Sequence, residues 1–403
     1  MRRLVYVNNR YRHYDRVKYR TLAASFDLRV VWIGPPPEGE APPTELVERF
    51  RNEILDPKKR SKLQPWHLIR SLRLFRRLRF LSRNADLVVS STSDSWKSKV
   101  AFAAAAGRAP VAFRKERWLD LSTPVLTRPY WLLDQFLTDW IEKRARGVLV
   151  GGRKAREYLL ERGHAVERIL QFSYLHEDLA EEPPDAEIAA ELERFKGRSL
   201  LLLYLGRIMP QKGLDCLIRI VRKMIAAGED VKLVVVGEPI YQRTGRGGQS
   251  SSFYDRCRRL AEKEPRIEFR GAVAAESVHD YYRAADVFVH PHVFGVGGRE
   301  KADGWGNVLT EAASLSMPVI ASDRVGSAFD IVDDGMSGFL LRSRRLEVDL
   351  EAALTHFCRH PEAIESFGQK ARKRYETVVD ANRTVASIQE LMDSRDQSEG
   401  ASR

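Results

Sequence analysis

Short runs of apolar residues alternate with amphipathic stretches along the first half of the chain. Each run is continuous and ends in polar residues, which predicts buried strands at 4–7, 28–33, 87–90, 111–113 and 147–150. Helical periodicity follows two of them, at 131–144 and 153–162. Strands that alternate with helices are typical of a parallel sheet covered on both faces. The first half therefore predicts a doubly wound, Rossmann-like α/β domain.

The same alternation restarts after an acidic stretch that contains Pro183 and Pro184. Strands are expected at 200–205, 232–236, 267–269, 287–290 and 318–321, with helices at 214–227, 253–263 and 277–284. A second doubly wound domain would bind its ligand at the carboxyl ends of these strands. The expected organisation is a first Rossmann-like domain at 1–178, a linker at 179–196, a second such domain at 197–375, an amphipathic C-terminal crossover helix at 376–394 and a flexible tail at 395–403.

Composition favours a globular protein with anionic partners. The chain has 403 residues, 43% of them hydrophobic, which suits two packed cores. Its formal net charge of +12 favours a membrane surface, nucleic acid or phosphorylated small molecules. Cys216, Cys257 and Cys358 have neither zinc-site nor disulfide spacing, which fits the reducing cytoplasm. The apolar start of the chain is too short for a signal peptide, and no uninterrupted apolar run predicts a transmembrane helix.

Two cations follow the strand at 200–205, in the sequence from Gly206 to Gly213. The Arg207 guanidinium offers a planar fork to phosphate oxygens, and the Lys212 ammonium offers a compact charge. This pair suits a diphosphate that gains charge as it leaves. The alternative at this point is a basic turn exposed to solvent.

A second motif runs from Asp303 to Ala313. Gly304 and Gly306 would allow backbone to approach a ligand, and a helix that begins near Asn307 would direct free N–H groups at phosphate. Glu311 would lie one turn into that helix, where a carboxylate can accept hydrogen bonds from a ribose. The alternative is an ordinary helix with a surface glutamate and a packing tryptophan, Trp305.

These motifs together resemble glycosyltransferase family 4. The resemblance rests on Gly206-Arg207 through Lys212-Gly213, on the spacing of Asp303 and Glu311, and on the segments 317–326 and 335–339. It is close over 200–341 and looser over the whole chain. It implies the GT-B fold: two Rossmann-like domains facing across a cleft, with the C-terminal helix returning to the N-terminal domain. It also implies a retaining, metal-independent transfer from a UDP- or GDP-sugar, with no other cofactor.

The resemblance assigns roles to individual residues of the second domain. It places the diphosphate on Arg207 and Lys212, the ribose on Glu311 and the transferred sugar on Asp303, where the family usually has a glutamate. The remaining donor-binding candidates are Gly206, Glu238, Arg270, Gly304, Trp305, Gly306, Asn307 and Val308. The chain also departs from the family in long loops at 239–252 and 292–302, which are either lids over the donor or surface insertions.

The first domain carries weaker signals for the acceptor side. Its first loop, at 8–14, lacks the glycines common in the family; Arg10 and His13 within it are candidates for contact with substrate. Glu116 and Trp118 follow the strand at 111–113 and are further candidates. For His13 the alternative is a solvent-facing side chain, and for Glu116 a structural salt bridge.

The segment 58–83 is basic and amphipathic. It is predicted either to bind an anionic membrane, to pack on the first sheet with its arginines in water, or to do both. With the resemblance, it indicates a lipid-linked or cell-surface glycan precursor as acceptor, met peripherally at the cytoplasmic face of a membrane. Two rival hypotheses are a non-catalytic relative that binds nucleotide sugars and a basic nucleic-acid-binding protein. The second lacks any recognisable nucleic-acid-binding motif, so no nucleic acid is expected as a partner.

Overall fold

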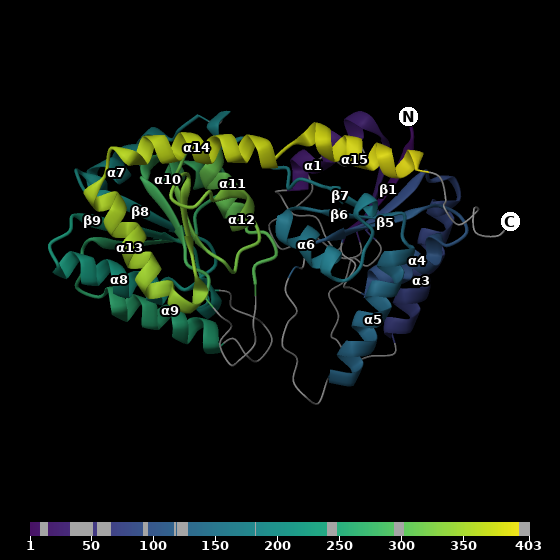
Figure 1. The fold of residues 1–403 in the computed structure, drawn as a ribbon, viewed down its shortest axis with the longest axis horizontal. Coiled ribbons are helices and arrows are strands. Elements are labelled where there is room, and N and C mark those ends of the chain that lie inside the picture. The colour runs from purple at the N-terminus through teal and green to yellow at the C-terminus, as the bar shows by residue number, and fades with distance from the viewer. Residues whose placement is uncertain are drawn as a thin grey trace. The chain divides into compact units, whose positions relative to one another are not determined.

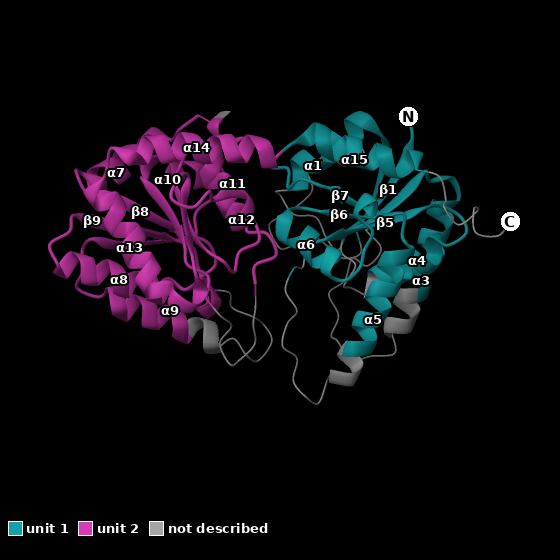
Figure 2. Cartoon of the chain, in the orientation of Figure 1, with its two compact units in different colours: residues 1–118, 123–177, 380–403 teal, residues 119–122, 178–379 magenta. Residues whose placement is uncertain are grey.

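The computed structural model describes residues 1–8, 15–32, 51–54, 66–91, 96–116, 118, 128–181, 183–239, 248–293 and 302–394 (Figure 1). The chain divides into two compact units (Figure 2). Unit 1 comprises 1–118, 123–177 and 380–403, and unit 2 comprises 119–122 and 178–379. Within the described residues, no helix has the length and apolar character needed to cross a membrane.

Unit 1 is built on a seven-stranded parallel sheet in the order β3-β2-β1-β4-β5-β6-β7. Its strands are β1 (Arg3–Asn8), β2 (Asp27–Trp32), β3 (Arg51–Ile54), β4 (Leu87–Ser90), β5 (Val111–Lys115), β6 (Gly147–Val150) and β7 (Ile169–Gln171). Its helices are α1 (Arg16–Ser25), α3 (Trp66–Leu81), α4 (Trp96–Ala105), α5 (Arg128–Arg144), α6 (Arg153–Glu161) and α15 (Ala381–Asp393).

Unit 2 is built on a six-stranded parallel sheet in the order β10-β9-β8-β11-β12-β13. Its strands are β8 (Leu200–Leu205), β9 (Val231–Val236), β10 (Ile267–Gly271), β11 (Val287–His290), β12 (Val319–Ser322) and β13 (Gly338–Leu341). Its helices are α7 (Ala186–Lys196), α8 (Leu214–Ala226), α9 (Gly248–Ala261), α10 (Val278–Ala284), α11 (Asn307–Ser314), α12 (Ala328–Ile331), α13 (Leu346–Arg359) and α14 (Ala363–Val378).

Alternate residues of each central strand enter different cores, as a doubly wound sheet requires. In β8, Leu202 and Tyr204 pack with α8, α9 and α13, whereas Leu201 and Leu203 pack with α7, α10, α11 and α14. Strand order reverses between β8 and β11, and the carboxyl ends of parallel strands at such a switch point form a crevice. That edge of unit 2 is therefore where its ligand site is expected.

The C-terminal part of the chain differs from the sequence-based expectation in detail. The single helix expected at 376–394 is instead the end of α14 followed by α15, with Val379 and Asp380 between them. Helix α15 packs Ile388 and Leu391 into the unit 1 core. The segment expected as a linker, 179–196, contains α7, whose Leu192 is buried in unit 2.

Candidate functional site

Three loops meet at the switch point of unit 2 and bring together charged side chains that are far apart in sequence. Lys212 ends a short 3₁₀ turn (Pro210–Lys212) after β8, His290 ends β11, and Asp303 precedes α11. The Lys212 ammonium donates to Asp303 Oδ2 at 2.5 Å and contacts His290 Nε2 at 3.3 Å. Lys212 is buried, which the sequence did not indicate, because both cations of this loop were expected to line an open crevice.

This cluster has a fixed charge state at neutral pH. Burial alone would raise the pKa of Asp303, but the Lys212 charge and hydrogen bond outweigh it and lower that pKa to about 2. Burial, reinforced by Lys212, lowers the pKa of His290 well below its usual value. The site therefore holds an ammonium, a carboxylate and a neutral imidazole, which accepts from Lys212 through Nε2.

The same cluster resembles a metal-binding group in its composition. His290, His292 and Asp303 place three possible ligand atoms within 4.8 Å of one another. However, the Lys212 ammonium already contacts two of these three residues. A side-chain cation thus occupies the position that a divalent ion would need, so these residues fit a lysine-centred cluster better than a metal centre.

Glycines allow the loops around this cluster to approach one another closely. Gly213 has a φ of +67°, and a Cβ there would lie 2.0 Å from the Pro291 carbonyl oxygen. Gly237 has a φ of +137°, and its Cβ would lie 1.9 Å from the carbonyl oxygen of Gly206. Any larger residue at these two positions would separate the loops.

Helix α11 presents its amino end at the same edge of the sheet. Gly306 precedes it with a φ of +90°, and no side chain caps the helix among the described residues. The first amides, at Asn307 and Val308, are therefore available to an anion. Gly304 and the buried Trp305 immediately precede Gly306 and form the segment that leads into this helix.

Glu311 is held by a residue that sequence reasoning missed. The Tyr282 hydroxyl, on α10, donates to Glu311 Oε2 at 3.0 Å and also lies 3.2 Å from the Val308 carbonyl. Burial, followed by the Glu311 charge, raises the pKa of Tyr282 well above its usual value, so the hydroxyl keeps its proton. One Glu311 oxygen is thus oriented, which leaves the other for a ligand.

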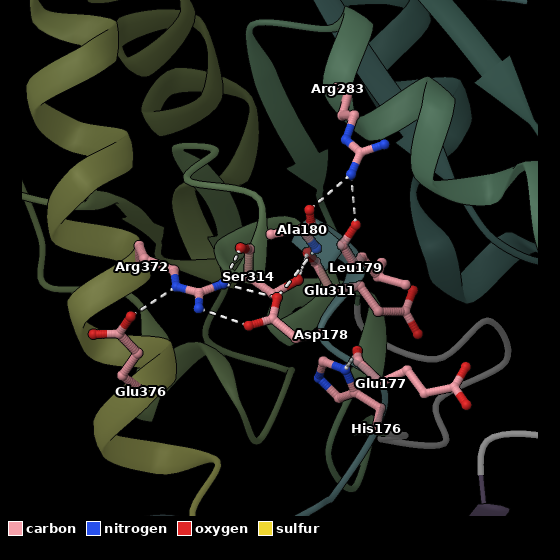
Figure 3. Close-up of polar contacts among 10 residues, drawn as sticks. All are labelled: His176, Glu177, Asp178, Leu179, Ala180, Arg283, Glu311, Ser314, Arg372 and Glu376. Carbon is pink, nitrogen blue, oxygen red and sulfur yellow. Dashed lines mark hydrogen bonds and ion pairs between the residues drawn. The ribbon is translucent and has the colours of Figure 1, made fainter. Parts of the chain in front are cut away.

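The carboxyl end of α11 is fixed as well (Figure 3). Arg372, on α14, binds the Ser314 carbonyl and forms a bidentate pair with Asp178 at 2.8 and 2.6 Å. Arg283 donates to the carbonyls of Leu179 and Ala180, so the segment 178–180 is tied to the α10 and α11 region. A cation at a helix carboxyl end is also favourable to the helix dipole.

The other donor-side candidates differ in their surroundings. Arg207 and Glu238 are exposed on the loops that follow β8 and β9. Arg270 is held by ion pairs with Glu191 at 2.5 Å and Glu268 at 3.0 Å. Arg207 is therefore accessible to a ligand, whereas Arg270 would have to leave two carboxylates to reach one.

On the acceptor side, Arg10 and His13 lie outside the described residues. Glu116 and Trp118 are partly buried in unit 1. Glu116 pairs with Arg114 at 3.3 Å, and Arg114 lies over the Tyr174 ring at 4.1 Å. Glu116 thus has the structural salt bridge that the sequence left open as an alternative.

A second lysine–aspartate pair in unit 1 was not predicted from the sequence. Lys18 Nζ lies 2.5 Å from Asp15 Oδ1, at the start of α1. The ammonium also lies 5.1 Å from the centroid of the Tyr6 ring and 4.7 Å from that of the Tyr19 ring. A buried lysine next to an aspartate three residues earlier is indistinguishable in sequence from an exposed helical pair, so no local signal could have revealed it.

Comparison with known proteins identifies the class of unit 2. Residues 199–360, which contain the whole cluster, match the family model described as glycosyl transferases group 1. This part of the chain therefore resembles glycosyl transferases of group 1. The expected family resemblance is thereby confirmed.

Curated members of this glycosyl transferase family resemble part of the chain. D-inositol 3-phosphate glycosyltransferase 2 of Catenulispora acidiphila is 30% identical over 47% of this chain and 42% of its own length. The phosphatidylinositol N-acetylglucosaminyltransferase gpi3 subunit of Schizosaccharomyces pombe is 25% identical over 46% and 37%. Trehalose synthase of Pyrococcus horikoshii is 27% identical over 65% and 60%. The chain thus spans less than two thirds of the length of these relatives.

Solved structures match nearly the whole chain in fold. Anabaena HepE in complex with UDP and glucose has a TM-score of 0.72 and 15% identity, over 97% of this chain and 99% of that chain. Sucrose-phosphate synthase from Thermosynechococcus elongatus has a TM-score of 0.70 and 16% identity, over 97% and 98%. These likenesses establish the fold, which is GT-B as expected.

Proposed function

We propose that this protein transfers a sugar from a nucleoside-diphosphate sugar to an acceptor, with retention of configuration and without a metal ion. The observation that carries the proposal is the Lys212 ammonium between Asp303 and His290, beside the uncapped start of α11. An ammonium and free backbone amides at one edge of a sheet are suited to a departing diphosphate. The solved relative in complex with UDP and glucose supports this class of donor.

Each side chain of the cluster has a distinct task in this proposal. Arg207 and Lys212 bind the diphosphate and stabilise the charge that it gains as the bond to the sugar breaks. Glu311, oriented by Tyr282, binds the ribose. Asp303, ionised because of Lys212, accepts hydrogen bonds from the sugar. The departing diphosphate takes the proton of the acceptor hydroxyl on the face where the new bond forms.

We also propose that the acceptor is a lipid-linked or cell-surface glycan precursor, met at the cytoplasmic face of a membrane and bound by unit 1. One relative is named for phosphatidylinositol, which is a membrane lipid. Within the segment 58–83, α3 exposes Arg73 and Arg76 while it buries Leu74 and Leu78, and Arg83 is exposed just after the helix. This arrangement combines the two roles expected for the segment, since one stripe packs inward and the other carries charge.

The test uses the purified full chain in the presence of a chelator. Thermal unfolding is measured with UDP and with GDP, and nucleotide release is followed with the corresponding glucose donors. A diphosphate at one hundred times its dissociation constant adds about 2.7 kcal/mol to the free energy of unfolding. The proposal fails if neither diphosphate stabilises the chain, or if stabilisation requires a divalent metal. Binding without any release of nucleotide from a donor and acceptor mixture would favour the non-catalytic relative.

A further inference from the structure

Helix α5 of unit 1 has the reverse of the usual polarity for a helix on the surface of a globular protein. Five large apolar side chains between positions 132 and 140 are exposed: Leu132 (54%), Leu133 (65%), Phe136 (66%), Leu137 (40%) and Trp140 (40%). They occupy positions i, i+1, i+4, i+5 and i+8, which form one continuous stripe along a helix. A stripe of this kind normally faces a core.

The acidic residues of α5 all form ion pairs with cations of unit 1. Asp134 pairs with Lys99 at 2.6 Å, Asp139 pairs with Arg162, and Glu142 forms a fully buried pair with Lys115 at 2.9 Å. These pairs join α5 to α4, α6 and β5. The outward side of the described part of α5 therefore combines apolar groups with the basic residues at its end.

Basic residues surround the stripe. Lys143 and Arg144 are exposed in the last turn of α5, and the Arg144 guanidinium lies 4.1 Å from the centroid of the Trp140 ring. Helix α3 lies on the same side of unit 1 in Figure 2 and shares a core with α4 and α5. It exposes Arg73 and Arg76 together with Leu72 and Phe80, and Arg83 is exposed in the turn that follows it. Apolar side chains flanked by cations complement an anionic bilayer, which offers hydrocarbon beneath negative headgroups.

We infer that α5 inserts its apolar stripe into an anionic lipid surface and that α3 supplies electrostatic attraction beside it. The stripe, named here the α5 stripe, comprises Leu132, Leu133, Phe136, Leu137 and Trp140. This assignment extends the membrane contact from a basic helix to a defined insertion element. It depends on the contacts of unit 1 alone and does not depend on which donor unit 2 binds.

The test is sedimentation of the full chain with vesicles made of phosphatidylcholine and phosphatidylglycerol in equal parts, and with vesicles of phosphatidylcholine alone. The double variant Leu133→Gln/Phe136→Gln is expected to lose at least about tenfold in partitioning to the mixed vesicles, because two inserted side chains lose their apolar contact with lipid. Its melting temperature should stay near that of the parent, because both side chains are exposed in the folded chain.

The matched control is Val166→Gln/Val348→Gln, which also removes two exposed apolar side chains but lies outside α5. It is expected to bind vesicles as the parent does. The variant Arg73→Gln/Arg76→Gln should weaken binding to the mixed vesicles by about fivefold per residue at low salt, and should leave binding to neutral vesicles unchanged.

The inference is overturned if the α5 double variant partitions like its control. It is also overturned if the parent ignores both kinds of vesicle and the α5 variant instead dissociates a dimer in light-scattering measurements, because the stripe would then bind a second copy of the chain.

Discussion

The two units each hold a lysine–aspartate pair at the carboxyl end of a parallel sheet, and the two pairs differ in what encloses them. Lys212 and Asp303 are 91 residues apart, and the Asp303 side chain retains 26% of its exposure. Lys18 and Asp15 are three residues apart, and both side chains are less than 10% exposed, against the rings of Tyr6 and Tyr19. The chemistry of the two pairs is the same, but their access to solvent differs.

Because of this difference, we expect the unit 2 pair to exchange one partner for a ligand, and the unit 1 pair to remain intact. In the proposed function a phosphate oxygen replaces Asp303 at Lys212, and the Asp303 side chain is exposed enough for this exchange, at 26%. Access to Lys18 is more restricted, because its side chain is only 5% exposed and lies near two aromatic rings. Burial alone would lower the pKa of Lys18, but Asp15 outweighs it and raises that pKa above its usual value. We therefore expect the unit 1 pair to contribute mainly to stability, and the proposed function assigns the unit 2 pair to binding.

The largest expected effect is on folding and comes from Lys18→Met. Removing the ammonium leaves the Asp15 carboxylate buried without its cation, which costs about 3 to 5 kcal/mol in the free energy of unfolding. Lys212→Met, as the matched change in unit 2, is expected to destabilise less, because Asp303 is partly solvated. Urea unfolding of both variants measures the difference. Equal losses of unfolding free energy in the two variants would contradict the distinction between a buried pair and a partly exposed one.

The next effect is on turnover and comes from Arg207→Ala. Arg207 is exposed, so its loss should leave the melting temperature nearly unchanged. Removal of a group that stabilises the charge of a leaving diphosphate commonly lowers the rate on the order of a hundredfold. Steady-state release of nucleotide measures this loss of turnover, and Arg222→Ala on the exposed side of α8 is the control. A variant with near-parental turnover would end the assignment of Arg207 to the diphosphate.

A smaller effect tests Tyr282 as the residue that positions Glu311. Tyr282→Phe removes the hydrogen bond to Glu311 Oε2. Loss of one such bond, worth about 1 kcal/mol, should weaken nucleoside diphosphate binding roughly fivefold. The control Tyr281→Phe removes a hydroxyl from the adjacent residue of α10. In a Glu311→Ala background the Tyr282 change should have no further effect on affinity, whereas a purely structural role would give the same loss in both backgrounds.

The last effect concerns another buried charge cluster of unit 1 and depends on pH. Burial lowers the pKa of His164, which lies beside the Lys115–Glu142 pair, from 6.5 to about 4. The unfolded chain binds the proton more tightly, so stability contributed by neutral His164 is present above pH 6.5 and is lost as pH falls towards 4. The slope is at most about 1.4 kcal/mol per pH unit. His164→Gln should flatten this part of the stability profile; an unchanged slope would contradict a buried, neutral His164.

Local sequence patterns were sufficient to predict the central strands of both sheets. They did not predict most of the edge strands or the contact between Lys212 and Asp303. The run 200–205 is continuous and apolar because β8 is buried on both faces, and its bounds were predicted as found. The edge strands β3, β7 and β13 were missed. Length alone does not explain this, because β4, β6 and β11 have only four residues each and were predicted from apolar runs that are buried throughout. The burial of Lys212 depends on Asp303, 91 residues away, which no local pattern reports.

The sequence also did not predict which face of helix α5 is buried. Residues 131–144 were predicted as a helix, and α5 is one. Its apolar stripe nevertheless faces outward, and its acidic residues pair with Lys99, Lys115 and Arg162 of unit 1. Periodicity identifies two faces of a helix, but only the partners of each face decide which one is buried.

The central claim is that the two acids of unit 2 divide the donor between them, and calorimetry on two variants tests it most directly. The titrant is whichever of UDP and GDP stabilises the parent more. Glu311→Ala should weaken its binding by about 1 to 3 kcal/mol, because the ribose loses a charged partner. Asp303→Asn should leave this affinity undiminished, because Lys212 keeps its charge, while turnover of the intact donor falls. If Asp303→Asn weakens the bare diphosphate as much as Glu311→Ala does, both acids serve the nucleotide and the division is wrong.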